Sequence, residues 1–92
     1  MERDRRYKII ANLITTGKLN NFREIFETLK KTVVKTDMGM HHDTFSKRLK
    51  HPESFTLKEM IHLASLIGVS HMTLIELIYK QYLSDQKLKL KK

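Results

Sequence analysis

Residues 32–67 read TVVKTDMGMHHDTFSKRLKHPESFTLKEMIHLASLI and contain the clearest local signals of the chain. Apolar residues flank Gly39: Val34 and Met38 before it, Phe45 and Leu49 after it. This spacing predicts two short helices that share one core and are joined by a tight turn at the glycine, which adopts a positive φ without steric cost. The second helix, predicted over residues 42–50, has a polar and partly cationic outer face: His42, Asp43, Ser46, Lys47 and Lys50.

Two further boundaries follow in the same stretch. Pro52 disfavours helical geometry in the residue before it, so the second helix is predicted to end near His51. Thr56 and Glu59 stand three residues apart before an apolar periodic segment, which is the pattern of a capping box. A helix is therefore predicted from there to Ile67. Its expected core-facing residues are Leu57, Met60, Ile61, Ala64 and Ile67.

Helical patterns also occupy the chain before this stretch. Apolar spacing predicts a first helix over residues 4–15, capped by Asp4 and stopped by Gly17. A second is predicted after Asn21, whose distance to Glu24 resembles a capping box, with an apolar stripe over residues 22–29. Thr32 is predicted to cap the short helix that ends at Met38. The segment KTVVKT is also compatible with a strand, although no partner strand is evident.

The last third of the chain carries more apolar surface than one small core covers. Ser70 is predicted to cap a helix that ends near Leu83, with two apolar sides: Met72, Ile75, Tyr79 and Tyr82, or Leu74, Leu77 and Ile78. One side meets the core, and the surplus points to a second copy of the chain. The expected dimerisation residues are Leu74, Leu77, Ile78 and Tyr82. Residues 84–92, SDQKLKLKK, are predicted to form a basic, flexible tail beyond a domain of residues 1–83.

Length and charge narrow the class of protein. Ninety-two residues are enough for one domain, and the pattern predicts a compact all-α bundle of five to six helices. Eighteen Lys and Arg against ten Asp and Glu leave a net charge of +8, which favours a polyanionic partner. The N-terminal residues MERDRRYK lack the apolar segment of a signal peptide, and no run approaches the roughly 18–20 apolar residues of a membrane span. We therefore expect a cytoplasmic protein that does not contact membranes.

Metal and catalytic chemistry are not indicated. The chain has no cysteine, which excludes disulfides and thiolate zinc sites, and its five histidines do not follow a recognised ligand spacing. His41 and His42 are adjacent, so on a helix they point about 100° apart. No serine or threonine has a His and an acidic residue at a spacing that would indicate a catalytic nucleophile with its base. We predict no enzyme activity, no catalytic residue, no metal, no cofactor and no small-molecule substrate.

The segments GMHHDTFSKRL, HPESFTLKEM and LASLIGVS, in this order, resemble the lambda-repressor-like (XRE-type) helix-turn-helix family. The resemblance covers roughly residues 17–78. It rests on the turn glycine Gly39, the apolar Met40, the buried Phe45, Pro52 in the next loop, Ala64, and the run Ile67 to Ser70. Two departures stand out: Lys35 occupies the usual alanine position where the two motif helices touch, and the segment between Gly17 and Gly39 is long. Residues 22–29 are either an added helix or part of a lengthened motif helix.

The resemblance implies a duplex-DNA-binding homodimer that regulates transcription, as phage and plasmid repressors and antitoxins do. Transferred position by position, the residues that contact bases are His41, His42, Asp43, Thr44, Ser46, Lys47 and Lys50. Phosphate contacts are expected from Lys31 and Thr32, and Arg48 either reaches a phosphate or pairs with Glu53. Two alternatives remain: an RNA-binding module that uses the same basic surface, and a helical protein-interaction module with a degenerate motif.

Overall fold

The computed structural model of the chain describes the backbone of residues 4–90 and the side chains of residues 4–87. This part of the chain forms six α-helices and two 3₁₀ turns and contains no strand, so the predicted all-α class is confirmed and KTVVKT is helical. The 3₁₀ turns span Phe22–Glu24 and Pro52–Ser54. The helices are α1 Arg6–Thr15, α2 Ile25–Thr28, α3 Lys31–Met38, α4 His42–Lys50, α5 Leu57–Ile67 and α6 His71–Leu90.

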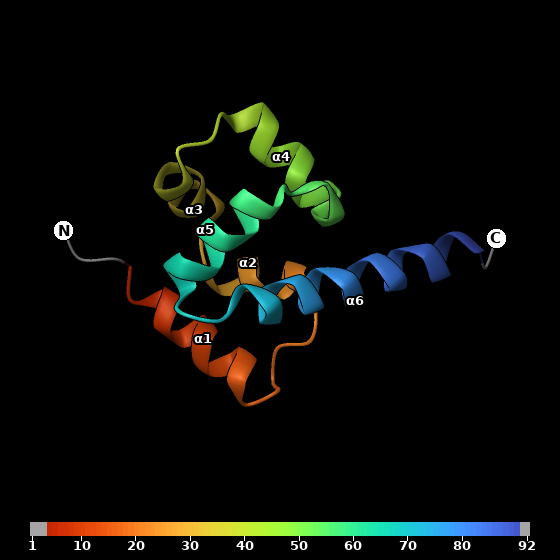
Figure 1. Ribbon diagram of the computed structural model, residues 1–92, viewed down its shortest axis with the longest axis horizontal. Coiled ribbons are helices and arrows are strands. Elements are labelled where there is room, and N and C mark those ends of the chain that lie inside the picture. The colour runs from red at the N-terminus through yellow and green to blue at the C-terminus, as the bar shows by residue number, and fades with distance from the viewer. Residues whose placement is uncertain (1–3, 91–92) are drawn as a thin grey trace.

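Helix α5 lies at the centre of the arrangement and contacts α1, α3 and α6 (Figure 1). Helix α4 lies at one end of the molecule and α1 at the other, while the C-terminal half of α6 projects past the remaining helices (Figure 1). A helix of 20 residues is about 30 Å long, which accounts for much of the longest dimension, 47 Å. Helix α4, on the side of the bundle opposite α1, lies at its edge (Figure 1).

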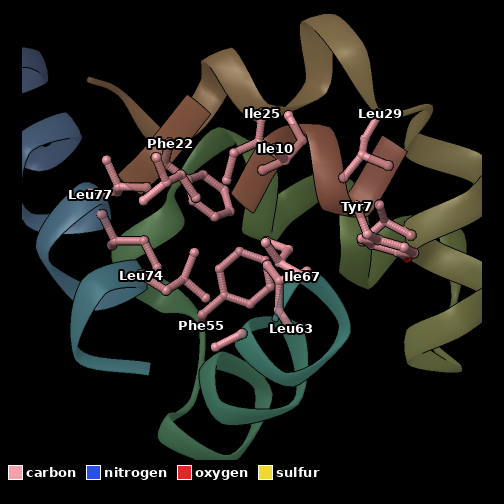
Figure 2. Packing of buried hydrophobic residues seen from close by; sticks show 14 of the residues in the cluster. Tyr7, Ile10, Phe22, Ile25, Leu29, Phe55, Leu63, Ile67, Leu74 and Leu77 are labelled. Carbon is pink, nitrogen blue, oxygen red and sulfur yellow. The ribbon is translucent and has the colours of Figure 1, made fainter. Parts of the chain in front are cut away.

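The core is a single apolar cluster to which every helix contributes. At its centre, the Phe22 ring meets the rings of Phe26 and Phe55 edge-on, with centroids 5.7 and 5.6 Å away. Leu74 and Leu77 of α6 approach Phe22 and Phe55 from the same side (Figure 2). Edge-to-face packing is a preferred aromatic geometry and adds to the gain from burial. The buried apolar residues are Tyr7, Ile10, Ile14, Leu19, Phe22, Ile25, Leu29, Val34, Met38, Phe45, Phe55, Leu63, Ala64, Ile67, Leu74, Leu77 and Ile78.

Three helix-boundary signals are confirmed. Gly39 is left-handed with φ +66°, and the backbone N–H of Met40 donates to the carbonyl oxygen of Lys35 at 3.1 Å, which closes α3. Thr56 and Glu59 form the reciprocal capping box, with hydrogen bonds of 3.1 and 2.9 Å. The Ser70 hydroxyl accepts the N–H of Met72 at 3.2 Å and begins α6. Each signal depends on residues at most five positions apart, which explains why it is readable locally.

Gly39→Val should lower the free energy of unfolding by more than about 1 kcal/mol, because a β-branched residue is disfavoured at positive φ. A Cβ at this position would meet no atom within 4 Å, so the cost is conformational and not a clash. Gly39→Asn, which tolerates the left-handed region, should cost less. Denaturant unfolding of both variants measures the difference; equal stability of the valine variant and the wild type would contradict it.

Two predicted caps are wrong. Asn21 makes no side-chain capping bond, because the first turn is 3₁₀ and the Glu24 N–H donates to the backbone carbonyl of Asn21 at 3.2 Å. Helix α3 begins two residues earlier than predicted, so Lys30 is its N-cap and Thr32 lies inside the first turn. The first helix begins at Arg6 and not at Asp4, although the Asp4 carboxylate accepts the Arg6 N–H at 2.9 Å.

The predicted inner face of α5 is rotated. Ala64 and Ile67 are buried as predicted and Met60 packs against the core, but Leu57 is 60% exposed and Ile61 45% exposed, and the unpredicted Leu63 is buried in their place. Both sets of residues have helical spacing, so periodicity alone does not choose between them. Contacts with α1, α3 and α6 select the face that carries Leu63.

Helix α6 also differs from its prediction. It continues to Leu90 and does not end near Leu83, so residues 84–90 are not a separate structureless tail; residues 91 and 92 lie outside the described part of the chain. Leu74, Leu77 and Ile78 are at most 5% exposed in the core. Their assignment to a dimer surface is therefore wrong. The exposed apolar side of α6 is the other one, with Met72, Tyr79, Tyr82 and Leu83.

Candidate nucleic-acid interface

The outer face of α4 is built by the spacing of one buried aromatic residue. Phe45 is 3% exposed and its ring meets that of Phe26 edge-on at 6.1 Å, which fixes the inward side of the helix. His42, Asp43, Lys47 and Lys50 are consequently exposed, and Thr44 and Ser46 are partly exposed; His41 is the exposed N-cap residue. Asp43 lies in the first turn, where a carboxylate is favoured by the helix dipole.

The structure brings together residues that were predicted for two different roles. Lys31 and Thr32, in the first turn of α3, line the same groove as His42, Ser46 and Lys50 of α4. His41, Asp43, Thr44 and Lys47 lie outside this groove, on or beside the rest of α4. Among the described side chains, none forms an ion pair with Lys31, Lys47 or Lys50. The surface formed by the start of α3 and the outer face of α4 thus offers unneutralised cations.

Arg48 anchors α4 to the start of α5. Its Nε donates to Glu59 Oε1 at 3.0 Å, and the side chains of both residues are about three-quarters buried, at 25% and 23% exposure. The pairing of Arg48 with Glu53 considered from the sequence is wrong, because Glu53 lies 3.6 Å from His51 Nδ1 instead. Glu59 also accepts the Thr56 N–H, so a single carboxylate caps α5 and holds α4. Arg48 positions the outer face and is not part of it.

A second arginine, Arg23, holds the C-terminal end of α4. Its Nη2 donates to the carbonyl oxygen of Lys50 at 2.9 Å, and its two terminal nitrogens donate to the two carboxylate oxygens of Asp85, each at 3.0 Å. The buried Gln81 donates to Asp85 at 3.1 Å. Sequence reasoning missed this network, because Arg23 and Asp85 are 62 positions apart. Only the continuation of α6 past Leu83 brings Asp85 to Arg23.

Both anchoring carboxylates favour their charged forms. Burial alone raises the pKa of Glu59, but the Thr56 N–H and the Arg48 guanidinium outweigh it and leave the pKa below its ordinary value. The hydrogen bonds from Arg23 hold the pKa of Asp85 below its ordinary value, against the opposing effect of burial and with help from Gln81. The attachments of α4 are therefore at full strength when these groups are ionised.

Acid should weaken the two attachments of α4. A carboxyl whose pKa is lower in the folded chain adds stability above its unfolded pKa and loses that stability as the pH falls through its folded pKa. For Glu59 and Asp85 the loss should begin near their ordinary values of 4.5 and 3.8 and continue below them. Thermal unfolding over this range should show a steeper fall in wild type than in a Glu59→Gln, Asp85→Asn variant. Parallel curves would contradict the predicted role.

Known proteins give no direct guide to this surface. Comparison with models of protein families, with curated proteins and with solved structures finds no match to the chain.

Within residues 4–87, no three His, Asp or Glu side chains come together in a way that could hold a metal ion. No single helix in the described part of the chain is long and apolar enough to cross a bilayer. Helices α5 and α6 together have the length and apolar composition of a membrane span, but they meet at a bend of 113°.

Proposed function

We propose that the chain is a sequence-specific, duplex-DNA-binding regulator of transcription whose α3 and α4 act as a lambda-repressor-like helix-turn-helix. The observation that carries the proposal is the outer face of α4. It combines the exposed Lys47 and Lys50, which have no ion-pair partner within residues 4–87, with short polar side chains on a firmly anchored helix. Base edges are read by side chains of this kind, provided that the helix that carries them has a fixed position.

The surface suits the major groove of B-form DNA. That groove is about 12 Å wide and admits one α-helix, whereas the major groove of double-stranded RNA is too narrow for side chains to read. Helix α4 lies at the edge of the bundle (Figure 1), and in the described part of the chain its His42, Asp43, Lys47 and Lys50 side chains are exposed. Lysine side chains donate to guanine O6 and N7, and serine and threonine hydroxyls serve either base pair. We assign base contacts to the residues predicted for this role: His41, His42, Asp43, Thr44, Ser46, Lys47 and Lys50.

Phosphate contacts come from the start of α3. The first N–H groups of a helix have no partner inside the helix, and Lys31 adds a full positive charge beside them. Lys31 and Thr32 are both exposed and line the groove shared with α4. A strand of the duplex that runs across this groove would place a phosphate at α3 while α4 enters the major groove.

A homodimer completes the proposal. The exposed side of α6 carries Met72, Tyr79, Tyr82 and Leu83, and a hollow beside it is lined by Met60, Ile75 and Ile78. Apolar side chains gathered in this way are typical of protein–protein contacts. A two-fold dimer would present two α4 helices to one face of the duplex, about 34 Å apart, one helical turn of DNA.

Selection of bound duplexes from a random pool tests the proposal directly. We expect a consensus that is palindromic, because a two-fold dimer reads two inverted half-sites. The same protein should not retain structured RNA in competition at equal salt. A pool that shows no enrichment, or stronger retention of RNA than of any duplex, would overturn the proposal.

Lys47→Ala should weaken binding to the selected site by about 1–3 kcal/mol and relax preference at one base pair, because a base contact is lost. Lys8→Ala is the matched control: it removes the same charge from an exposed position on α1, at the far end from α4 (Figure 1). The control should leave sequence preference unchanged. Titration of cognate and random duplexes at two salt concentrations gives both readouts. If Lys47→Ala weakened all duplexes equally, its assignment as a base contact would be wrong.

A further inference from the structure

Between α3 and α4 lies a half-open groove with a volume of about 460 Å³. Its apolar lining comes from Phe26, Phe45 and Leu49, of which Phe26 and Leu49 are partly exposed. The long side chain of Lys35 also lines the groove. The Phe45 ring of α4 meets the Phe26 ring edge-on at 6.1 Å, and these two rings together with Leu49 form the apolar floor.

The rim of the groove is cationic. Lys31 and Lys35 of α3 and Lys50 of α4 line it, together with the hydroxyl-bearing Thr32 and Ser46. Within residues 4–87, no carboxylate lines the groove and no acidic side chain pairs with any of these three lysines. Arg23 also reaches the groove, but Asp85 already neutralises it. An occupant would therefore meet three free ammonium groups around an apolar floor.

We propose that this groove binds a small amphipathic anion: a carboxylate with an aliphatic or aromatic body. The apolar body would cover Phe26 and Leu49, and removal of that surface from water is favourable in proportion to its area. The carboxylate would lie among the lysines, where an opposite charge is missing. The volume lies within the range of about 300–1,000 Å³ that is usual for small-molecule sites.

The size of the floor argues for a small molecule over a partner helix. A docked helix needs apolar anchors repeated along several turns, at i, i+3 or i+4, and i+7. Three apolar side chains gathered under one opening give room for a single apolar body. The site stands independently of DNA binding. One consequence does rest on the proposed function: Lys31 and Lys50 would serve both ligands, so the carboxylate should compete with duplex DNA.

Decanoate is a suitable probe of this site. We expect it to shift the amide resonances of residues around the groove, from α2, α3 and α4, in a saturable titration. Decyltrimethylammonium, with a similar body and the opposite charge, and acetate, with the charge and no body, should each bind at least about tenfold more weakly. Comparable binding of either control, or decanoate shifts that centre on the exposed side of α6, would overturn the proposal.

Charge reversal provides the second arm. Lys35→Glu should weaken decanoate binding by about tenfold or more, whereas Lys8→Glu, the same change on α1, should leave it unchanged. Thermal unfolding of both variants verifies that each is folded. Equal affinities of the two variants would overturn the proposal. A chain that binds decanoate but no duplex would refute the proposed function alone, and one that binds duplex but not decanoate would refute the groove site alone.

Discussion

Phe22→Ala should lower the free energy of unfolding by about 3–5 kcal/mol, the largest effect we expect from a single truncation in this chain. Phe22 is fully buried and stands between two other rings, at 5.7 Å from Phe26 and 5.6 Å from Phe55. Leu74 and Leu77 close the same space from α6 (Figure 2). Removal of the ring would leave a cavity at the junction of three segments, which cannot all move inward to fill it.

Phe26→Ala is the matched control for this prediction. Phe26 is only partly buried and lies beside the groove, so solvent reaches the space that its ring leaves. We expect a clearly smaller loss of stability than for Phe22→Ala. Denaturant unfolding monitored by circular dichroism measures both variants. If Phe26→Ala cost as much as Phe22→Ala, the core would be centred nearer the groove than the contacts indicate.

Leu77→Glu and Tyr79→Glu should affect different properties, folding and self-association, although the two residues are only two positions apart on α6. Leu77 is 5% exposed, and a carboxylate in its place would be buried without a partner, which costs several kcal/mol and should unfold much of the protein. Tyr79 is 59% exposed and its replacement should leave the fold intact. If the exposed side of α6 is the dimer contact, Tyr79→Glu should instead weaken self-association.

Two measurements separate these outcomes. Thermal unfolding should detect the loss in Leu77→Glu, and sedimentation over a range of concentrations should detect a shift toward monomer in Tyr79→Glu. Wild-type protein that sediments as a monomer at high concentration, with and without DNA, would remove the dimer from the proposal. A stable, folded Leu77→Glu variant would contradict the burial of this side of α6.

The anchoring of α4 has a consequence for how the proposed interface works. Its C-terminal half is held by Arg48 to Glu59 and by Arg23 to Asp85 and the Lys50 carbonyl. At its N-terminal end, His41 makes no capping bond through its side chain. The helix is therefore fixed most firmly at the end away from Gly39. Because Asp85 belongs to α6, the helix proposed for dimerisation also helps to orient the helix proposed to read DNA.

Local chemistry in the sequence was sufficient for several parts of this fold. The left-handed Gly39, the helix end before Pro52 and the Thr56–Glu59 capping box depend on φ preferences and hydrogen bonds within a few residues, so they are readable without knowledge of the partners. The outer face of α4 was predictable for a similar reason, since one turn of helix joins Phe45 to Leu49 and leaves the other side polar.

Tertiary contacts were needed wherever two local patterns were equally good. Helix α5 has two overlapping apolar stripes and α6 has two apolar sides, and only packing against neighbouring helices selects Leu63 over Ile61 or Leu77 over Tyr79. The anchors of α4 are also invisible in the sequence, because an ion pair such as Arg23–Asp85 depends on where two distant segments of the chain meet. Hydrogen bonds within a turn are encoded by neighbours, whereas burial and long-range pairing depend on the whole chain, since each face of a helix is buried only if another element covers it.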